Sequence, residues 1–147
     1  MLTMRQIRKA TPSSIFGNHE YSRVVKMSRG RTKAGARFVR ALTCSPWDNN
    51  GFRRANPPQY STSVVVVGTR AKKVAIKSAW LMFDYIKCSC SCPYFTFYGC
   101  EVELWKRGAA DIYYSNGKDP IVRNPAERPW ACKHLLALFD KIDNHTL

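Results

Sequence analysis

Short segments rich in Val, Phe and Leu recur in the first 87 residues and resemble β-strands, and in the last of them Leu81, Phe83 and Tyr85 alternate with their neighbours as in a half-buried strand. Turn-forming residues separate these segments, for example in Gly30–Gly35. The expected strands are Ser22–Ser28, Arg37–Thr43, Thr62–Val67 and Val74–Ile86. This half of the chain therefore predicts an antiparallel sheet of about four or five strands.

The hydrophobic period changes towards the end of the chain. Ala131, Leu135, Leu138 and Ile142 recur at the three- and four-residue spacing of one helix face. A shorter helix is expected within Glu101–Ala110. We therefore predict an α+β fold, in which an antiparallel β-sheet in the front half is followed by a lobe that ends in an amphipathic helix.

The composition is that of a folded protein, because 45% of the 147 residues are hydrophobic and 23% are charged. No apolar run approaches the roughly 18–20 residues of a membrane-spanning helix, and Val64–Val67 is typical of the runs present. Residues 1–5 lack the charged and apolar blocks of a secretory signal. We expect a soluble protein inside a cell, without a membrane partner.

Basic residues are concentrated in the front of the chain. Residues 1–87 carry 17 Lys and Arg against three Asp and Glu, whereas residues 88–147 carry seven of each. Arginine outnumbers lysine in the front part, and its fork of N–H donors suits phosphate and carboxylate groups. This balance favours a contact surface for a polyanion or an acidic partner. The residues expected to make that contact are Arg5, Arg8, Lys9, Arg29, Arg31 and Lys33.

Six cysteines are present, and four of them fall between positions 88 and 100. A disulfide framework is not expected without a secretory signal, because the cytosol keeps thiols reduced. Metal binding explains the pattern better, because a Cys-x-Cys pair is followed after 39 residues by a Cys-x-His pair. Three thiolates and one imidazole form a tetrahedral zinc set. The predicted Zn²⁺ ligands are Cys90, Cys92, Cys132 and His134.

Helix geometry constrains the second pair. Residues two apart on a helix point about 200° away from each other. Cys132 is therefore expected to precede or cap the last helix, with His134 in its first turn.

Other cysteines leave alternatives open. Cys88 and Cys90 also form a Cys-x-Cys pair, although Pro93 directly after Cys92 favours the pair at 90 and 92. Cys44 and Cys100 are interpreted as small buried residues rather than ligands.

The residues around the predicted ligands resemble a known family. Cys-x-Cys-Pro-x-Phe, which ends at Phe95, followed at a distance by Cys-Lys-His-Leu-Leu-Ala-Leu, is similar to the SWIM-type zinc finger. The resemblance covers residues 88–142, and the spacer is long for that family. It implies a zinc-binding module of a kind that contacts either DNA or protein. The tyrosine-rich insert, with its Ser-Asn-Gly turn and Asn-Pro loop, more loosely resembles small virion proteins of tailed phages, which implies a structural role.

These features divide the chain into a basic N-terminal arm (1–20), an antiparallel β region (21–87) and a SWIM-like zinc-binding region (88–147). Four protein ligands close a zinc site, and no hydrolase or phosphate-loop motif is present, so neither an enzyme nor a small-molecule substrate is expected. We expect a zinc-stabilised structural or adaptor protein of an assembly, most simply a phage virion component of the head, neck, tail or baseplate. Its partners would be other protein subunits, and its location the virion after assembly in the host cytoplasm. The alternative is a nucleic-acid-binding SWIM protein, whose basic half would neutralise phosphates.

Overall fold

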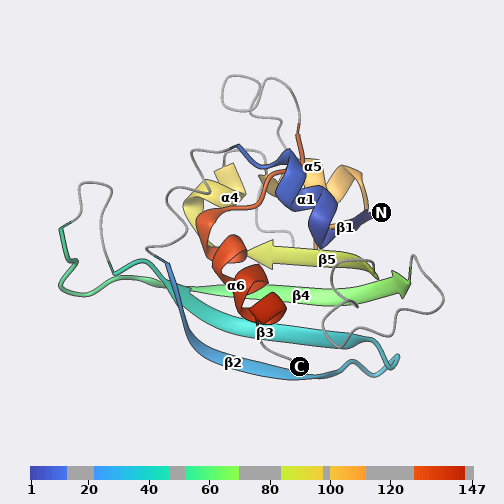
Figure 1. Ribbon diagram of the computed structural model, residues 1–147, viewed down its shortest axis with the longest axis horizontal. Helices are drawn as coiled ribbons and strands as arrows, with labels where there is room; N and C mark the ends of the chain where they lie inside the picture. The colour runs from blue at the N-terminus through green and yellow to red at the C-terminus, as the bar shows by residue number, and fades with distance from the viewer. Residues whose placement is uncertain (13–21, 47–51, 70–83, 98–99, 112–127, 145–147) are drawn as a thin grey trace.

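The computed structural model describes residues 1–12, 22–46, 52–69, 84–97, 100–111 and 128–144. A five-stranded antiparallel sheet runs through the molecule in the order β1-β5-β4-β3-β2 (Figure 1). The strands are β1 (Leu2–Thr3), β2 (Arg23–Arg31), β3 (Arg37–Cys44), β4 (Gln59–Thr69) and β5 (Asp84–Cys90). The helices are α1 (Met4–Ala10), α4 (Pro93–Phe97), α5 (Cys100–Lys106) and α6 (Lys133–Asn144). The predicted α+β class is confirmed.

Side-chain alternation gives the sheet one core face. In β3, Val39 and Ala41 are buried and Arg40 between them is exposed. The strand register places Val39 beside Val64 of β4, and Val64 beside Cys88 of β5. These side chains therefore form one continuous apolar surface, while Arg40 lies on the opposite face.

The described strands overlap the predicted segments but differ in extent, because β4 extends beyond Thr62–Val67 at both ends and β5 continues to Cys90. The turn between β2 and β3 is shorter than Gly30–Gly35, because β2 continues to Arg31, which pairs with Arg37. Gly35 closes this turn with a φ of 87°, a conformation that favours glycine. Of the predicted strand Val74–Ile86, residues 84–86 belong to β5 and the earlier part lies outside the described residues. Strand β1 was not predicted.

Two helices cover the core face of the sheet. α6 lies across β2 to β5, and α1 lies beside it against β1 and β5 (Figure 1). The apolar side of α6, including Leu135, Leu138 and Phe139, is fully buried, and each such side chain contributes about 1.5–3 kcal/mol. The predicted amphipathic helix is confirmed. No helix within the described ranges has the length and apolar character needed to cross a bilayer.

The first ten residues form part of the sheet and the core, whereas the sequence suggested an arm. Leu2 and Thr3 pair with β5, and the Thr3 hydroxyl accepts from the Gln6 N–H in a capping box. Met4 and Ile7 are fully buried. The segment has few apolar residues, so its hydrophobic pattern indicates a helix only weakly, and the Thr3–Gln6 capping box is the signal that marks its start. Residues 13–20 of the expected arm lie outside the described residues.

Helix α5 ends in a Schellman motif that returns the chain to β5. The Ala109 N–H bonds the Leu104 carbonyl (2.7 Å), the Gly108 N–H bonds the Trp105 carbonyl (3.0 Å), and Gly108 has a φ of 68°. The Cys88 N–H then bonds the Ala109 carbonyl at 2.9 Å. Gly108 therefore ends the helix predicted at Glu101–Ala110 and lays the following residues along the sheet.

Candidate metal centre

The two predicted ligand pairs lie where β5, α4 and α6 meet. Cys90 is the last residue of β5, Cys92 directly precedes α4, Cys132 directly precedes α6, and His134 lies in the first turn of α6. All four side chains are buried, and one ligand atom of each lies within 4.8 Å of the others. A tetrahedron with Zn–S bonds of about 2.3 Å has S···S edges of about 3.8 Å, so the cluster has the size of a zinc site.

Cys92 and Cys132 occupy equivalent N-cap positions on two helices. The Thr96 N–H bonds the Cys92 carbonyl (3.2 Å), and the Leu136 N–H bonds the Cys132 carbonyl (3.0 Å). Pro93 then falls at the first position of α4, where its missing N–H costs nothing. The predicted place of Cys132 at the start of α6 is confirmed.

The three sulfur atoms accept hydrogen bonds from backbone N–H groups. The Cys92 N–H points to the Cys90 Sγ (3.5 Å), the Phe95 N–H to the Cys92 Sγ (3.4 Å), and the Leu135 N–H to the Cys132 Sγ (3.5 Å). Such bonds stabilise the anionic form of a sulfur atom, as do the helix N-termini at two of them. The local backbone therefore favours thiolates.

His134 is held by one ring nitrogen only. Its Nε2 lies 3.2 Å from the Ser45 hydroxyl, which lies 2.8 Å from the Ser22 hydroxyl. The Tyr60 ring packs against the imidazole with a centroid separation of 4.9 Å. The Nδ1 atom is buried and has no hydrogen-bond partner. A buried nitrogen without a partner is costly, and a bond to a metal ion would satisfy it.

Burial and mutual hydrogen bonding set the protonation of the thiols. Hydrogen bonds from the Cys132 and Cys90 thiols hold the pKa of Cys92 well below its usual range, although burial opposes them. Burial raises the pKa of Cys90 and of Cys132. Without a metal ion, the cluster therefore favours a Cys92 thiolate that accepts hydrogen bonds from the thiols of Cys90 and Cys132. A divalent cation would let all three sulfur atoms ionise.

The segment before Cys132 is positioned from the other end of the chain. The Thr11 hydroxyl, at the end of α1, accepts from the Ala131 N–H (3.0 Å) and donates to the Ile7 carbonyl (2.8 Å). The Arg8 guanidinium pairs with Asp140 of α6 at 2.6 Å. The N-terminal helix therefore holds α6, and with it one ligand pair, in place.

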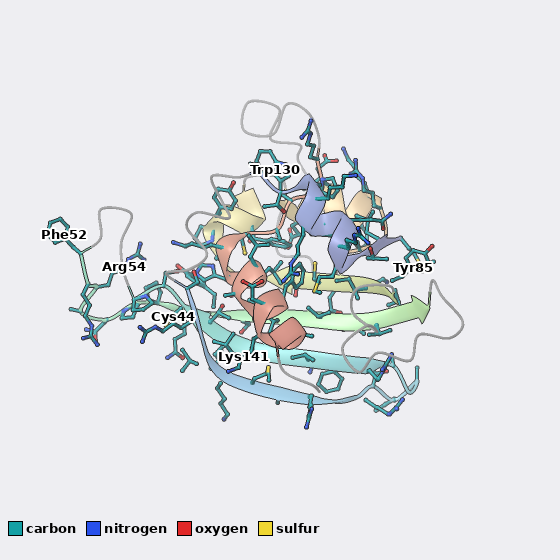
Figure 2. The ribbon with its side chains drawn as sticks, in the orientation of Figure 1. Cys44, Phe52, Arg54, Tyr85, Trp130 and Lys141 are labelled. Atoms are coloured by element: carbon teal, nitrogen blue, oxygen red, sulfur yellow. The ribbon has the colours of Figure 1, made fainter. Side chains whose placement is uncertain are left out.

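Two further cysteines lie outside the cluster. Cys88 shares a face with Cys90, but two residues span about 6.6 Å along a strand, which is too far for a common ion. Cys44 is the last residue of β3, and Cys90 is the last residue of β5, which runs in the same direction. Both lie at the end of the sheet opposite Tyr85 (Figure 2). Thr43 lies on the core face, so strand alternation places the Cys44 side chain on the opposite face of the sheet. Cys44 is a buried free thiol. The side chain of Cys100 lies outside the described residues.

The six basic residues predicted to contact a partner fall into two groups. Arg5, Arg8 and Lys9 lie on α1 at the β1–β5 edge, whereas Arg29, Arg31 and Lys33 lie on β2 and its turn at the opposite edge. Four strand spacings of about 4.8 Å separate the two edges. Arg8 is engaged with Asp140, and the other five are exposed. The predicted residues therefore do not form one continuous patch.

Sequence reasoning did not find the residues around His134. Ser45, Ser22 and Tyr60 are distant from it along the chain, and serine or tyrosine residues of this kind carry no spacing signal. Only the pairing of β2, β3 and β4 brings them under the start of α6.

Comparisons with known proteins found no match: no family model, no curated protein and no solved structure matches this chain.

Proposed function

We propose that the protein is a non-enzymatic structural or adaptor subunit in which one Zn²⁺ is bound by Cys90, Cys92, Cys132 and His134. The observation that carries this proposal is the His134 Nδ1, which is buried without a hydrogen-bond partner beside three buried sulfur atoms. If Nδ1 binds the ion, Nε2 carries the proton and donates to the Ser45 hydroxyl. This is the usual arrangement of a histidine ligand.

The donor set supports zinc over other ions. Soft thiolates with an imidazole suit Zn²⁺, whereas Mg²⁺ and Ca²⁺ prefer oxygen ligands. The three N–H···S hydrogen bonds reduce the negative charge that three thiolates place around a divalent ion.

The proposed zinc is structural. Four protein ligands fill a tetrahedral site, and a catalytic zinc needs an open position for water or substrate. All four ligands are buried, His134 with 4% of its surface exposed, so a substrate has no direct access to the ion.

The proposal includes a SWIM-type module in a virion. The pattern Cys-x-Cys-Pro-x-Phe supports it, because Phe95 packs in the core beside the cluster. The amphipathic helix α6, which begins beside His134, supports it too. The looser resemblance to tailed-phage proteins favours a subunit of the head, neck, tail or baseplate, which docks on neighbouring protein subunits.

The test of the metal is elemental analysis of the purified protein together with Co²⁺ substitution. We expect one equivalent of zinc, and a cobalt spectrum with tetrahedral d–d bands and thiolate charge transfer. Cys88→Ala and Cys44→Ser are the matched controls and should keep the full equivalent. Less than half an equivalent of zinc in protein prepared without chelator would contradict the proposal.

A second candidate function is nucleic-acid binding, which the exposure of Arg5, Lys9, Arg29, Arg31 and Lys33 favours. About six phosphate contacts would give a log–log salt slope near −5 on duplex DNA. An assembly subunit should instead bind nucleic acid only at the non-specific level, with a Kd of about 10⁻⁴–10⁻⁶ M at physiological salt. Nanomolar, sequence-selective binding under those conditions would replace the assembly role with this one.

A further inference from the structure

The face of the sheet opposite α1 and α6 contains a pocket of about 200 Å³. Its lining includes two cations and several hydroxyls. The residues used below are Lys26, Ser28, Arg40, Ser61, Ser63 and Ser89. None of them belongs to the metal cluster or to the basic residues predicted from the sequence.

The strand register explains why the sheet is hollowed here. Ser28, Arg40, Ser63 and Ser89 stand in one row across β2, β3, β4 and β5. Lys26 belongs to the next row, with Ser61 two strands away. Serine side chains are short, so the long side chains of Lys26 and Arg40 rise beside an unfilled space.

Lys26 and Arg40 both line the pocket. Lys26 and Arg40 are diagonal neighbours on paired strands, about 7–8 Å apart at the backbone. Neither forms an ion pair with a carboxylate among the described residues. Two like charges at this spacing repel each other, and an anion between them would relieve the repulsion.

The Arg40 guanidinium is held in place before any ligand arrives. It lies 4.7 Å from the centroid of the Phe38 ring, on the same face of β3. Phe38 in turn packs over Gly30 of β2, where an added Cβ would lie 3.1 Å from the ring. The planar fork is therefore pre-oriented, which lowers the entropy lost on binding.

Two of the serine hydroxyls are already hydrogen-bonded within the protein, and two others are not. Ser63 donates to the Asp111 carboxylate (2.7 Å), so the 2.7 Å contact between Ser63 and Ser89 is a bond donated by Ser89. This bond uses one oxygen of Asp111, whose carboxylate lies at the Ser63 and Ser89 side of the pocket. In the described part of the chain, the hydroxyls of Ser28 and Ser61 have no hydrogen-bond partner and remain available to a ligand.

We propose that this pocket binds a phosphate group. A guanidinium fork, an ammonium and two free hydroxyls offer more donors than the two oxygens of a carboxylate can use, whereas a phosphate presents three or four oxygens. The pocket has room for about six water molecules at roughly 30 Å³ each, enough for a phosphate and part of the group attached to it. This site goes beyond the structural role proposed above and is independent of the metal.

The test is calorimetric titration of the full-length protein with inorganic phosphate, with adenosine 5′-monophosphate and with a short oligonucleotide that lacks terminal phosphates. Arg40→Gln and Lys26→Gln should each weaken binding about tenfold or more, because each removes a charge-assisted hydrogen bond. Arg5→Gln removes the same charge at the opposite edge of the sheet and should leave the affinity unchanged. Zinc content and circular dichroism check that each variant is folded, and Ser61→Ala gives a milder second probe.

Each result decides the matter. Binding of phosphate or the monophosphate that depends on Arg40 and Lys26 supports the proposal and indicates a small phosphorylated ligand. Binding of the oligonucleotide alone, with the same dependence, also supports it and indicates a nucleic-acid backbone. No binding of any of the three at millimolar concentration overturns it, as does an equal loss in Arg5→Gln.

Discussion

The corner where β5, α4 and α6 meet and the edge formed by β2 and β3 are stabilised in different ways. At the corner, three sulfur atoms and a ring nitrogen are buried within 4.8 Å of one another. At the edge, exposed basic side chains project from a ladder of backbone pairs that runs from Arg23 to Arg31. Backbone pairs join β2 to β3 at the edge, whereas the corner leaves His134 Nδ1 unsatisfied. The chain therefore places a cluster of possible metal ligands in the core and exposed positive charge on the surface.

The largest expected effect is the loss of a thiolate at the corner. A structural Zn²⁺ contributes an apparent binding free energy of about 10–16 kcal/mol at neutral pH, as much as a whole domain's stability of about 5–15 kcal/mol. Cys132→Ser should therefore unfold α6, and chelation should do the same. Helical circular dichroism and limited proteolysis measure the loss. Cys44→Ser is the control, and an equally stable Cys132→Ser protein would remove the distinction between the corner and the edge.

The next effect separates the apolar core from the ion. Phe139 is fully buried on α6, and Phe139→Ala should lower the free energy of unfolding by about 3–5 kcal/mol. The native fraction should keep one equivalent of zinc, because Phe139 is not a ligand. Urea unfolding measures the change. Phe52→Ala, at a side chain that is 71% exposed, should stay within about 0.5 kcal/mol of the wild type.

A smaller effect concerns the partner of the imidazole. Ser45→Ala removes the group that lies 3.2 Å from His134 Nε2 and should weaken zinc affinity about 10–100-fold. Competition with a chromophoric chelator measures the affinity. Ser22→Ala, one hydroxyl further away, should weaken it less. An unchanged zinc affinity in Ser45→Ala would contradict the expected role of the Ser45 hydrogen bond in orienting His134.

The smallest effects are expected at the edge. Gly35→Ala places a side chain at a φ of 87° and should cost about 1–2 kcal/mol. Gly30→Ala should cost less than about 1 kcal/mol, because the half-exposed Phe38 ring can move by the few tenths of an ångström required. Thermal unfolding measures both, and neither should change zinc content. A larger cost for Gly30→Ala would show that this edge is packed as tightly as the core.

Regular patterns made much of this structure predictable. The apolar residues Phe38, Val39 and Leu42 between turn-forming segments identified β3. The spacing of Leu135, Leu138 and Ile142 identified α6, because it reflects the burial of one face. The clustering of Cys90, Cys92, Cys132 and His134 was predictable from their spacing, because two pairs of soft ligands match a tetrahedral zinc set.

Other features depend on contacts that leave no local pattern. Strand β1 is too short to show alternation, and α4 is a single turn whose start is set by Cys92 and Pro93. The Ser45–His134 contact and the row from Ser28 to Ser89 exist only because strands far apart in sequence are paired in register. Serine occurs in many structural surroundings, so the position of a serine in the sequence does not indicate that it contacts a ligand or lines a pocket.

The separation of the two ligand pairs has a consequence during protein synthesis. After Cys92 is made, 39 further residues must be added before Cys132 follows. At about 5–20 residues per second this takes about 2–8 s. During that interval Cys90 and Cys92 have been synthesised without Cys132 and His134. The four residues can therefore come together only after the start of the last helix has been made, however early the strands pair.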